Sequence, residues 1–216
     1  MINAKIERRV YFEMKKYVIH CLMGAIKKQN AYTNEQLEVI QYGLESIYIL
    51  ITKLLFITFL AYLLGMLYEY FVFLLIYNLI RMPSFGLHAT KSWICLVTSS
   101  LVFLIMPVIA KYLILPIYIK SIMGAIALLL VYKNAPADTE KRPIVNATRR
   151  LTYKYISVFV AFILLMSSLI LPNIFIGNSC FWVIIVQCFM ISPTIYELFG
   201  LPHDNYLNYQ KTLNMG

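Results

Sequence analysis

After a polar N-terminal stretch, the chain is dominated by long apolar runs that short polar breaks separate. A helix needs about 20 apolar residues to cross a bilayer. Six runs approach that length, although the second is short and the fourth is interrupted by Pro116 and Lys120. The predicted spans are residues 44–65, 66–80, 93–110, 112–132, 152–171 and 179–199. The pattern therefore predicts an all-α polytopic membrane protein with about six transmembrane helices.

Residues 1–43 form the long polar stretch, and their apolar positions recur at helical spacing from Ile6 to Ala25. Basic residues lie between them, which predicts an N-terminal amphipathic helix. Such a helix lies on a membrane surface or packs against the protein's own transmembrane helices. Residues 33–36 have the form of a capping box and are predicted to start a helix that runs into the first span. The polar, basic start has no apolar core typical of a signal peptide.

Composition supports a membrane protein and excludes other classes. The 216 residues are 61% hydrophobic and 13% charged, with a mean hydropathy of +0.72. A soluble chain is about 45–50% apolar and about 25% charged. This excludes an ordinary cytosolic domain, a disordered chain and a secreted disulfide scaffold. The four scattered cysteines form no CxxC pair and no HExxH occurs, so we expect no metal site and no other cofactor.

The basic residues give the predicted orientation. Fifteen Lys and Arg residues fall in segments that are cytoplasmic if the N-terminus is inside, against Lys111 alone on the other side. This bias predicts an N-in, C-in topology with a cytoplasmic tail at 200–216. The net charge of +9 then serves topology and binding to anionic lipid headgroups rather than nucleic acid. Lys53 and Lys120 fall inside predicted spans, where they are either functional charges or snorkelling side chains.

The predicted inner-face segment 81–95 is unusually polar for this chain. It contains the chemically notable residues Arg81, Pro83, Gly86, His88 and Cys95. Pro83 and Gly86 predict that the second span does not continue as a straight helix. A seven-residue helical rise of about 10.5 Å would hold Cys95 too far from His88 for direct proton transfer. We therefore expect a bend if the two residues act together.

Two interpretations of these residues stay open from the segment itself. In the functional one, His88 takes the proton of the Cys95 thiol and later gives it to a leaving amine. Arg81 then either stabilises the thiolate or binds a carboxylate. In the structural one, Cys95 is a small packing residue and His88 a solvated loop residue.

A second polar segment, residues 133–151, contains two prolines and many charges. It is predicted to be a cytoplasmic loop rather than a span. The loop either only sets topology or forms a docking surface for an acidic partner. Its candidate substrate-binding residues are Lys141, Arg142, Arg149 and Arg150.

Together these features resemble the accessory gene regulator B (AgrB) family of Gram-positive quorum sensing. The resemblance rests on the Arg81…Gly86-Leu87-His88-Ala89…Cys95 pattern, on the residue 135–143 loop, and on the size and span layout. The family often has Gly-Gly before the His region, where this chain has Ser84-Phe85-Gly86-Leu87. That departure leaves the shape of the segment open.

The resemblance implies a membrane cysteine endopeptidase that removes the C-terminal tail of an AgrD-like precursor peptide at the cytoplasmic face. Cys95 would be the nucleophile, His88 the base and later the acid, and Arg81 a residue needed for activity. A thioester intermediate would then be attacked by an internal Cys or Ser of the precursor, which closes a thiolactone or lactone. A homodimer is also implied. On this basis residues 44–199 are the peptidase domain.

Two other functions are compatible with the pattern. A small membrane transporter or peptide exporter would use Lys53 and Lys120 and place no weight on Cys95, but the chain shows no repeated half. A non-catalytic scaffold would recruit a partner through the basic loop. Replacing Cys95 by Ala discriminates the enzyme from both.

Overall fold

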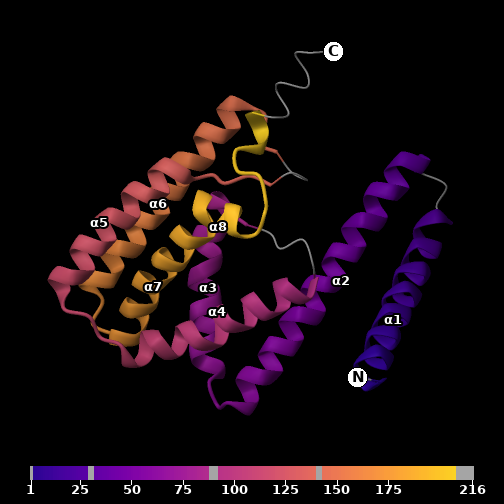
Figure 1. The fold of residues 1–216 in the computed structure, drawn as a ribbon, viewed down its shortest axis with the longest axis horizontal. Coiled ribbons are helices and arrows are strands. Elements are labelled where there is room, and N and C mark those ends of the chain that lie inside the picture. Colours follow the sequence, from indigo (N-terminus) through magenta and orange to yellow (C-terminus); the bar gives the residue numbers. More distant parts are fainter. Residues whose placement is uncertain (1, 29–31, 88–91, 140–142, 208–216) are drawn as a thin grey trace. The chain divides into compact units, whose positions relative to one another are not determined.

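The computed structural model describes residues 2–28, 32–87, 92–139 and 143–207, without the side chains of residues 2–14, 92 and 93. The described chain is helical, with a single isolated bridge between extended residues (Figure 1). Its helices are α1 (Ile2–Lys27), α2 (Asn34–Leu63), α3 (Leu67–Ser84), α4 (Ser92–Tyr112), α5 (Ile117–Asn134), α6 (Ala147–Ile170), α7 (Ile174–Met190) and α8 (Pro193–Leu198). They form two compact units, residues 1–59 and 60–216.

The first unit contains α1 and most of α2, and it confirms both helical predictions for the N-terminal region. The capping box is present: the Thr33 N–H donates to Gln36 Oε1 at 2.9 Å, and the Gln36 N–H donates to Thr33 Oγ1 at 3.3 Å. Helix α2 then continues unbroken through the first predicted span. An ion pair of 2.5 Å between Lys15 and Glu45 joins α1 to α2.

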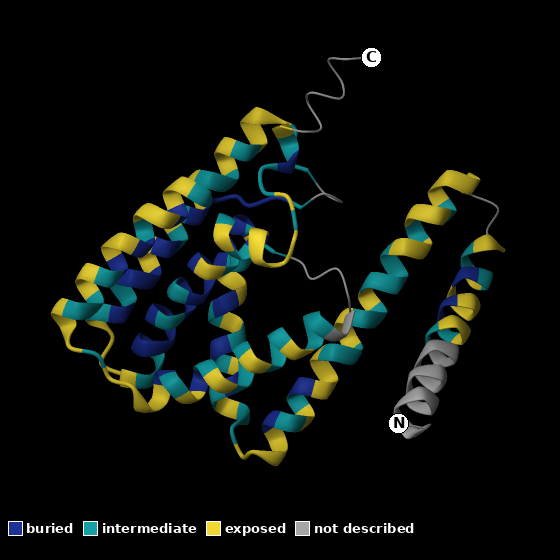
Figure 2. Ribbon diagram, in the orientation of Figure 1, coloured by how far each residue is buried: buried dark blue, intermediate teal, exposed yellow. Residues whose placement is uncertain are grey.

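The second unit is a helical bundle in which α7 lies innermost. Helix α7 packs against α3, α4, α5 and α6, and most of its residues from Gly177 to Cys188 are buried. Figure 2 shows the complementary pattern on α5 and α6, whose buried residues face inward while exposed ones face out. The packing is close: a Cβ on Gly124 of α5 would overlap the Leu165 side chain of α6. An exposed apolar outer face around a buried helix is typical of a bundle in lipid.

Within the described residues, four helices are long and apolar enough to cross a membrane: α2, α4, α5 and α6. Helix α7 is apolar but shorter, and α3 has 18 residues with Glu69 and Arg81 near its ends. These findings establish a polytopic membrane protein. The count of six spans remains a prediction, because it also requires α3 and α7 to cross.

The connections of the second unit gather at two opposite ends. At one end, the residues that follow α3 contact those that follow α5 and the end of α7. At the other end, Glu69 at the start of α3 pairs with Lys111 at the end of α4 at 2.6 Å. Consecutive helices therefore run up and down, as the six-span prediction requires. The first end carries the loop 133–151, which contains five of the eleven Lys and Arg residues of this unit, and it is the predicted inner end.

Two predicted span boundaries were wrong, and proline explains both. The fourth span was expected to begin at Tyr112 and contain Pro116, but Pro116 is the residue that precedes α5. The sixth was expected to run through residue 199, but α7 ends at Met190 and α8 starts at Pro193. Proline lacks the N–H that continues a helix and disfavours helical backbone at the residue before it.

Candidate active site

Helix α3 ends at Ser84, which confirms the predicted interruption before Cys95. Phe85 has φ 55° and ψ −132°, and Gly86 has φ 117°, so the chain turns sharply out of the helix. The Phe85 ring packs edge-on against Tyr153 of α6, with 5.0 Å between ring centroids. Arg81 and Cys95 thus belong to different helices. We call Phe85, Gly86 and Leu87 the exit segment, since the chain continues from it to His88.

The Arg81 side chain binds the backbone carbonyls of the exit segment. Its Nη1 donates to the Phe85 carbonyl at 2.6 Å. Its Nη2 donates to the carbonyls of Gly86 at 3.2 Å and Leu87 at 2.8 Å. A guanidinium offers a rigid fork of donors, which suits the simultaneous binding of several oxygens. The expected roles of Arg81 were thiolate or carboxylate binding, whereas the donors described here bind backbone carbonyls.

Gly86 is the residue type that this arrangement requires. A φ of 117° disfavours any residue with a side chain. A Cβ at this position would also overlap Nη1 of Arg81 and lie 2.8 Å from the Met190 carbonyl oxygen. The Arg81 head group therefore occupies the volume that glycine leaves empty.

The segment that follows α5 supports the exit segment from the other side. Ala135, Ala137 and Asp138 are at most 5% exposed. The Gly86 N–H donates to the Ala137 carbonyl at 2.9 Å, and the Ala137 N–H donates to the Ser84 carbonyl at 3.0 Å. These bonds form a short parallel bridge. Residues 135–138 of the predicted cytoplasmic loop 133–151 are therefore buried, and the backbone there pairs with residues 84–86.

Asp138 is the centre of a buried polar cluster. Its carboxylate accepts from the backbone N–H groups of Ile144 (3.2 Å), Asn205 (3.0 Å) and Tyr206 (3.0 Å). Its carbonyl accepts from the Tyr196 hydroxyl at 3.1 Å. Burial raises the pKa of that hydroxyl, which keeps it a donor. We call Asp138, Ile144, Tyr196, Asn205 and Tyr206 the Asp138 cluster. It joins residues 144 and 205–206 to the segment after α5 that supports the exit segment.

The predicted substrate-binding residues differ in their surroundings. Arg150 forms ion pairs with Asp138 at 3.7 Å and Asp204 at 3.3 Å, and its guanidinium lies 3.5 Å from the centre of the Tyr206 ring. Arg149 is exposed and contacts Tyr153 through a hydrogen bond of 3.1 Å and its ring face. Arg149 thus presents its charge at the surface, while Arg150 is engaged in the fold. Lys141 and Arg142 lie outside the described residues.

Cys95 lies at the end of the first turn of α4 and is partly buried. The amino end of a helix favours negative charge, which suits a site where charge develops during acyl transfer. His88 lies outside the described residues, so the dyad itself stays a prediction. Figure 1 shows the start of α4 apart from the end of α3. Arg81 and the exit segment are therefore joined by hydrogen bonds at the end of α3, whereas Cys95 lies on a separate helix, α4.

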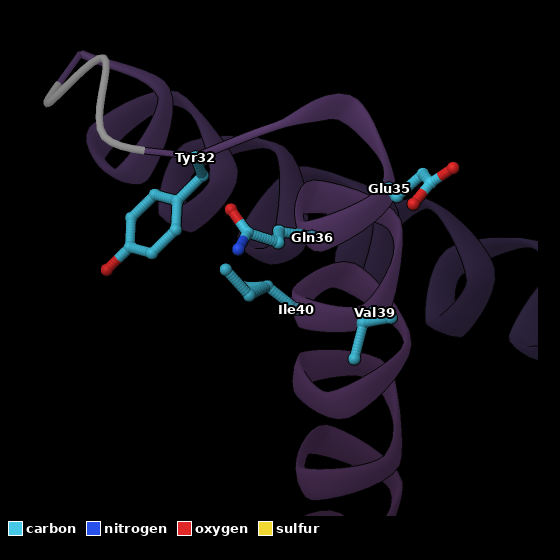
Figure 3. Close-up of a pocket in the computed structure, with 5 residues that line it drawn as sticks. All are labelled: Tyr32, Glu35, Gln36, Val39 and Ile40. Atoms are coloured by element: carbon cyan, nitrogen blue, oxygen red, sulfur yellow. The ribbon is translucent and has the colours of Figure 1, made fainter.

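The described residues contain two further polar features, one in each compact unit. A shallow hollow at the start of α2, in the first unit, is lined by Tyr32, Glu35, Gln36, Val39 and Ile40 (Figure 3). Lys120, one of the two lysines inside a predicted span, donates to Asn178 Oδ1 at 2.5 Å. Asn178 in turn donates to the Ala110 carbonyl at 2.9 Å. Lys120 therefore links α5 to α7 and α4.

Comparison with known protein families shows to which family the chain belongs. The profile of the family Accessory gene regulator B matches residues 19–191. The chain belongs to this family. A putative AgrB-like protein of Clostridium acetobutylicum is 31% identical over 171 residues, which covers 79% of this chain and 82% of the relative. The accessory gene regulator protein B of Staphylococcus carnosus is 31% identical over 155 residues, covering 70% and 78%. No solved structure matches the chain.

Membership of the AgrB family implies a role in processing AgrD-like precursors in quorum sensing. The match includes the segment from Arg81 to Cys95 and the loop with Arg149 and Arg150. The family resemblance drawn from the sequence motifs is therefore confirmed. The roles of the individual residues are a separate question, to which the geometry contributes.

Sequence reasoning missed several residues that hold the candidate site. Gln187 is fully buried in α7 and donates to the Phe85 carbonyl at 2.9 Å. Its signal was present, since Gln187 is the one amide in the otherwise apolar run 180–191 of a predicted span, and such residues commonly have a specific partner. Asp138 was read only as part of a charged loop. Neither Tyr196 nor Asn205 shows its role in a local pattern, because both act across more than 50 residues.

Proposed function

We propose that this AgrB family member is a membrane cysteine endopeptidase that removes the C-terminal tail of an AgrD-like peptide. The observation that carries the proposal is the family match, which spans both polar segments of one end of the bundle. The rigid hold on the exit segment supports it, because proton transfer requires a well-placed histidine. We place this end at the cytoplasmic face, in line with the bias of basic residues.

The proposed reaction uses Cys95 as nucleophile and His88 as base. His88 takes the thiol proton, and the sulfur attacks the scissile carbonyl carbon. The carbon–nitrogen bond breaks as His88 returns the proton to the leaving amine, so the tail departs and a thioester forms. An internal thiol or hydroxyl of the precursor then attacks the thioester, closes the ring and releases Cys95. Exclusion of water is needed, since hydrolysis competes with ring closure.

Arg81 enters this proposal as a positioning residue. Its donors bind the three carbonyls of the exit segment, which leads directly to His88. Arginine in this setting holds the backbone that directly precedes the proposed base. It requires no contact with the thiolate or with the substrate.

Substrate binding is proposed for the basic loop. Arg149, with Lys141 and Arg142, would attract the acidic tail of the precursor. Arg150 was expected to take part, but its ion pairs with Asp138 and Asp204 compete with any tail contact. We further propose a homodimer and contact with anionic lipids, in line with the family resemblance and the charge bias.

The test is cleavage of an AgrD-like precursor in membranes that contain the full chain. We expect Cys95→Ala to abolish cleavage while the protein still inserts at the parental level. Cys21→Ala is the matched control, because Cys21 also follows a histidine in sequence but lies in α1. Loss of cleavage in Cys21→Ala with retention in Cys95→Ala would refute the assignment. Unchanged cleavage in both variants would favour the alternative, a transporter or exporter that does not use these thiols.

A further inference from the structure

Gln187 is a buried amide inside the most buried helix of the bundle. Its side chain is fully buried, and Nε2 donates to the Phe85 carbonyl at 2.9 Å. Its Oε1 has no hydrogen-bond partner among the described residues. A buried acceptor without a partner costs stability, and such a group in a folded protein calls for an explanation. An apolar side chain of the same length would avoid that cost, so the amide has a use other than packing.

The carbonyl that Gln187 binds belongs to a strained residue. Phe85 is not glycine, yet its φ is 55° and its ψ −132°. Non-glycine residues stay in such conformations only where their surroundings hold them, and they concentrate at functional sites. The Phe85 oxygen accepts from two donors, Nη1 of Arg81 at 2.6 Å and Nε2 of Gln187 at 2.9 Å. Both lone pairs of this oxygen are therefore used.

Helix α7 also binds the last residue of the exit segment. The Leu87 N–H donates to the Met190 carbonyl at 2.9 Å. Met190 is the last residue of α7 and lies three residues after Gln187. Helix α7 thus holds the first and the last residue of the exit segment, and Arg81 holds all three carbonyls from α3.

We propose that Gln187 is a positioning residue for acyl transfer, which fixes the exit segment and thereby the backbone that leads to His88. The inference rests on the proposed function, because it needs a base that follows the segment. Gln187 does not touch the substrate. Its effect follows from geometry: a displacement of about 1 Å at a reacting group can cost roughly 100-fold in rate.

The experiment replaces the amide and keeps its volume. Gln187→Met preserves an unbranched side chain of similar length but removes the donor to Phe85. Cys188→Ala is the matched control, because Cys188 is the next residue and buried, and its thiol binds the Ala127 carbonyl of α5 at 3.4 Å instead. Parent, both variants and Cys95→Ala are purified as full chains in detergent. For each we measure kcat and KM for an AgrD-like precursor per folded enzyme, and the thermal midpoint.

We expect Gln187→Met to lower kcat by about 10- to 100-fold while KM stays within about twofold. Its thermal midpoint should be no lower than that of Cys188→Ala, since a buried acceptor with no partner among the described residues is removed. A purely structural residue would give the opposite pattern, a lower midpoint with unchanged kcat per folded enzyme. That pattern, or a loss of kcat no greater than in Cys188→Ala, overturns the proposal.

Gln187→Leu is a second variant without the amide, made in case Gln187→Met does not fold. If neither Gln187→Met nor Gln187→Leu folds, Gln187 is required for the fold and the positioning role is withdrawn. Cleavage by Cys95→Ala would refute the proposed function, and the positioning role with it. Cleavage by the parent, none by Cys95→Ala and full activity in Gln187→Met would refute the positioning role alone.

Discussion

The Asp138 cluster makes a sharp prediction about stability. The Asp138 carboxylate accepts three backbone N–H bonds and pairs with Arg150 at 3.7 Å, and its side chain is not exposed. Asp138→Asn keeps the shape but replaces one oxygen with an NH2 group. That group faces an N–H donor, so at least one backbone bond is lost and the others are no longer charge-assisted.

The magnitude follows from these bonds. One lost bond to a buried donor costs about 1–3 kcal/mol, and each retained bond weakens by roughly 1 kcal/mol as its acceptor becomes neutral. The total is at least about 3 kcal/mol, which is the lower end of the cost of breaking a buried ion pair. For a chain of this size, about 3 kcal/mol lowers the midpoint by roughly 6–12 °C.

Asp204→Asn provides the matched control. Asp204 pairs with the same Arg150 at 3.3 Å, but 44% of its side chain is exposed. Its φ of 55° is one that Asn adopts readily, so the backbone is undisturbed. An exposed pair contributes at most about 1 kcal/mol. We expect the midpoint of Asp204→Asn to fall by no more than roughly 4 °C.

The assay is thermal unfolding in detergent followed by a thiol-reactive fluorophore. Cys180 and Cys188 are buried and report when the bundle opens. Asp138→Asn should also lower kcat, because Ala137 supports the exit segment. If Asp138→Asn and Asp204→Asn unfold within about 2 °C of each other, the carboxylate does not stabilise this end of the bundle and the reasoning is refuted.

Two further predictions follow from the site. Gly86→Ala should lose most cleavage activity, because its Cβ would displace the Arg81 head group; wild-type kcat in this variant would contradict the described exit segment. Arg149→Gln should raise KM, more so at low salt, while Arg150→Gln should chiefly lower the thermal midpoint, because Arg150 pairs with Asp138 and Asp204. The measurements are KM for cleavage at two ionic strengths and the thermal midpoint, for both variants. If the two variants changed KM equally and changed the thermal midpoint equally, the separate roles of Arg149 and Arg150 would be contradicted.

The helices were largely predictable because apolar period and capping chemistry are local. The capping box at residues 33–36 and the interruption after Pro83 both follow from neighbouring residues. The two span boundaries that were predicted wrongly lie at Pro116 and Pro193. Both prolines interrupt an apolar run, and hydropathy alone does not show that the helix stops there. Residues 135–138 could not be assigned as buried, since a charged loop looks solvated until its long-range partners are known.

The candidate site was predictable in its residue types and not in its contacts. Arg81 was recognised, but its carbonyl partners depend on Phe85 adopting a positive φ, which no propensity indicates. Arg150 was read as part of a basic surface because the sequence does not reveal that Asp138 is buried beside it. Gln187 contacts Phe85 across 102 residues, so only the assembled bundle brings them together.

The described polar groups of this end act mainly on backbone rather than on a ligand. Arg81 and Gln187 lie in helices and direct their donors to the carbonyls of the exit segment, and the Asp138 carboxylate binds three backbone N–H groups. Buried polar groups in a lipid-facing bundle are costly unless paired. Irregular backbone at a helix end therefore requires such partners before it can carry a reactive residue. If the proposed function holds, the segment that precedes the base is held before substrate arrives, and the precursor would bring its scissile bond to the Cys95 thiol.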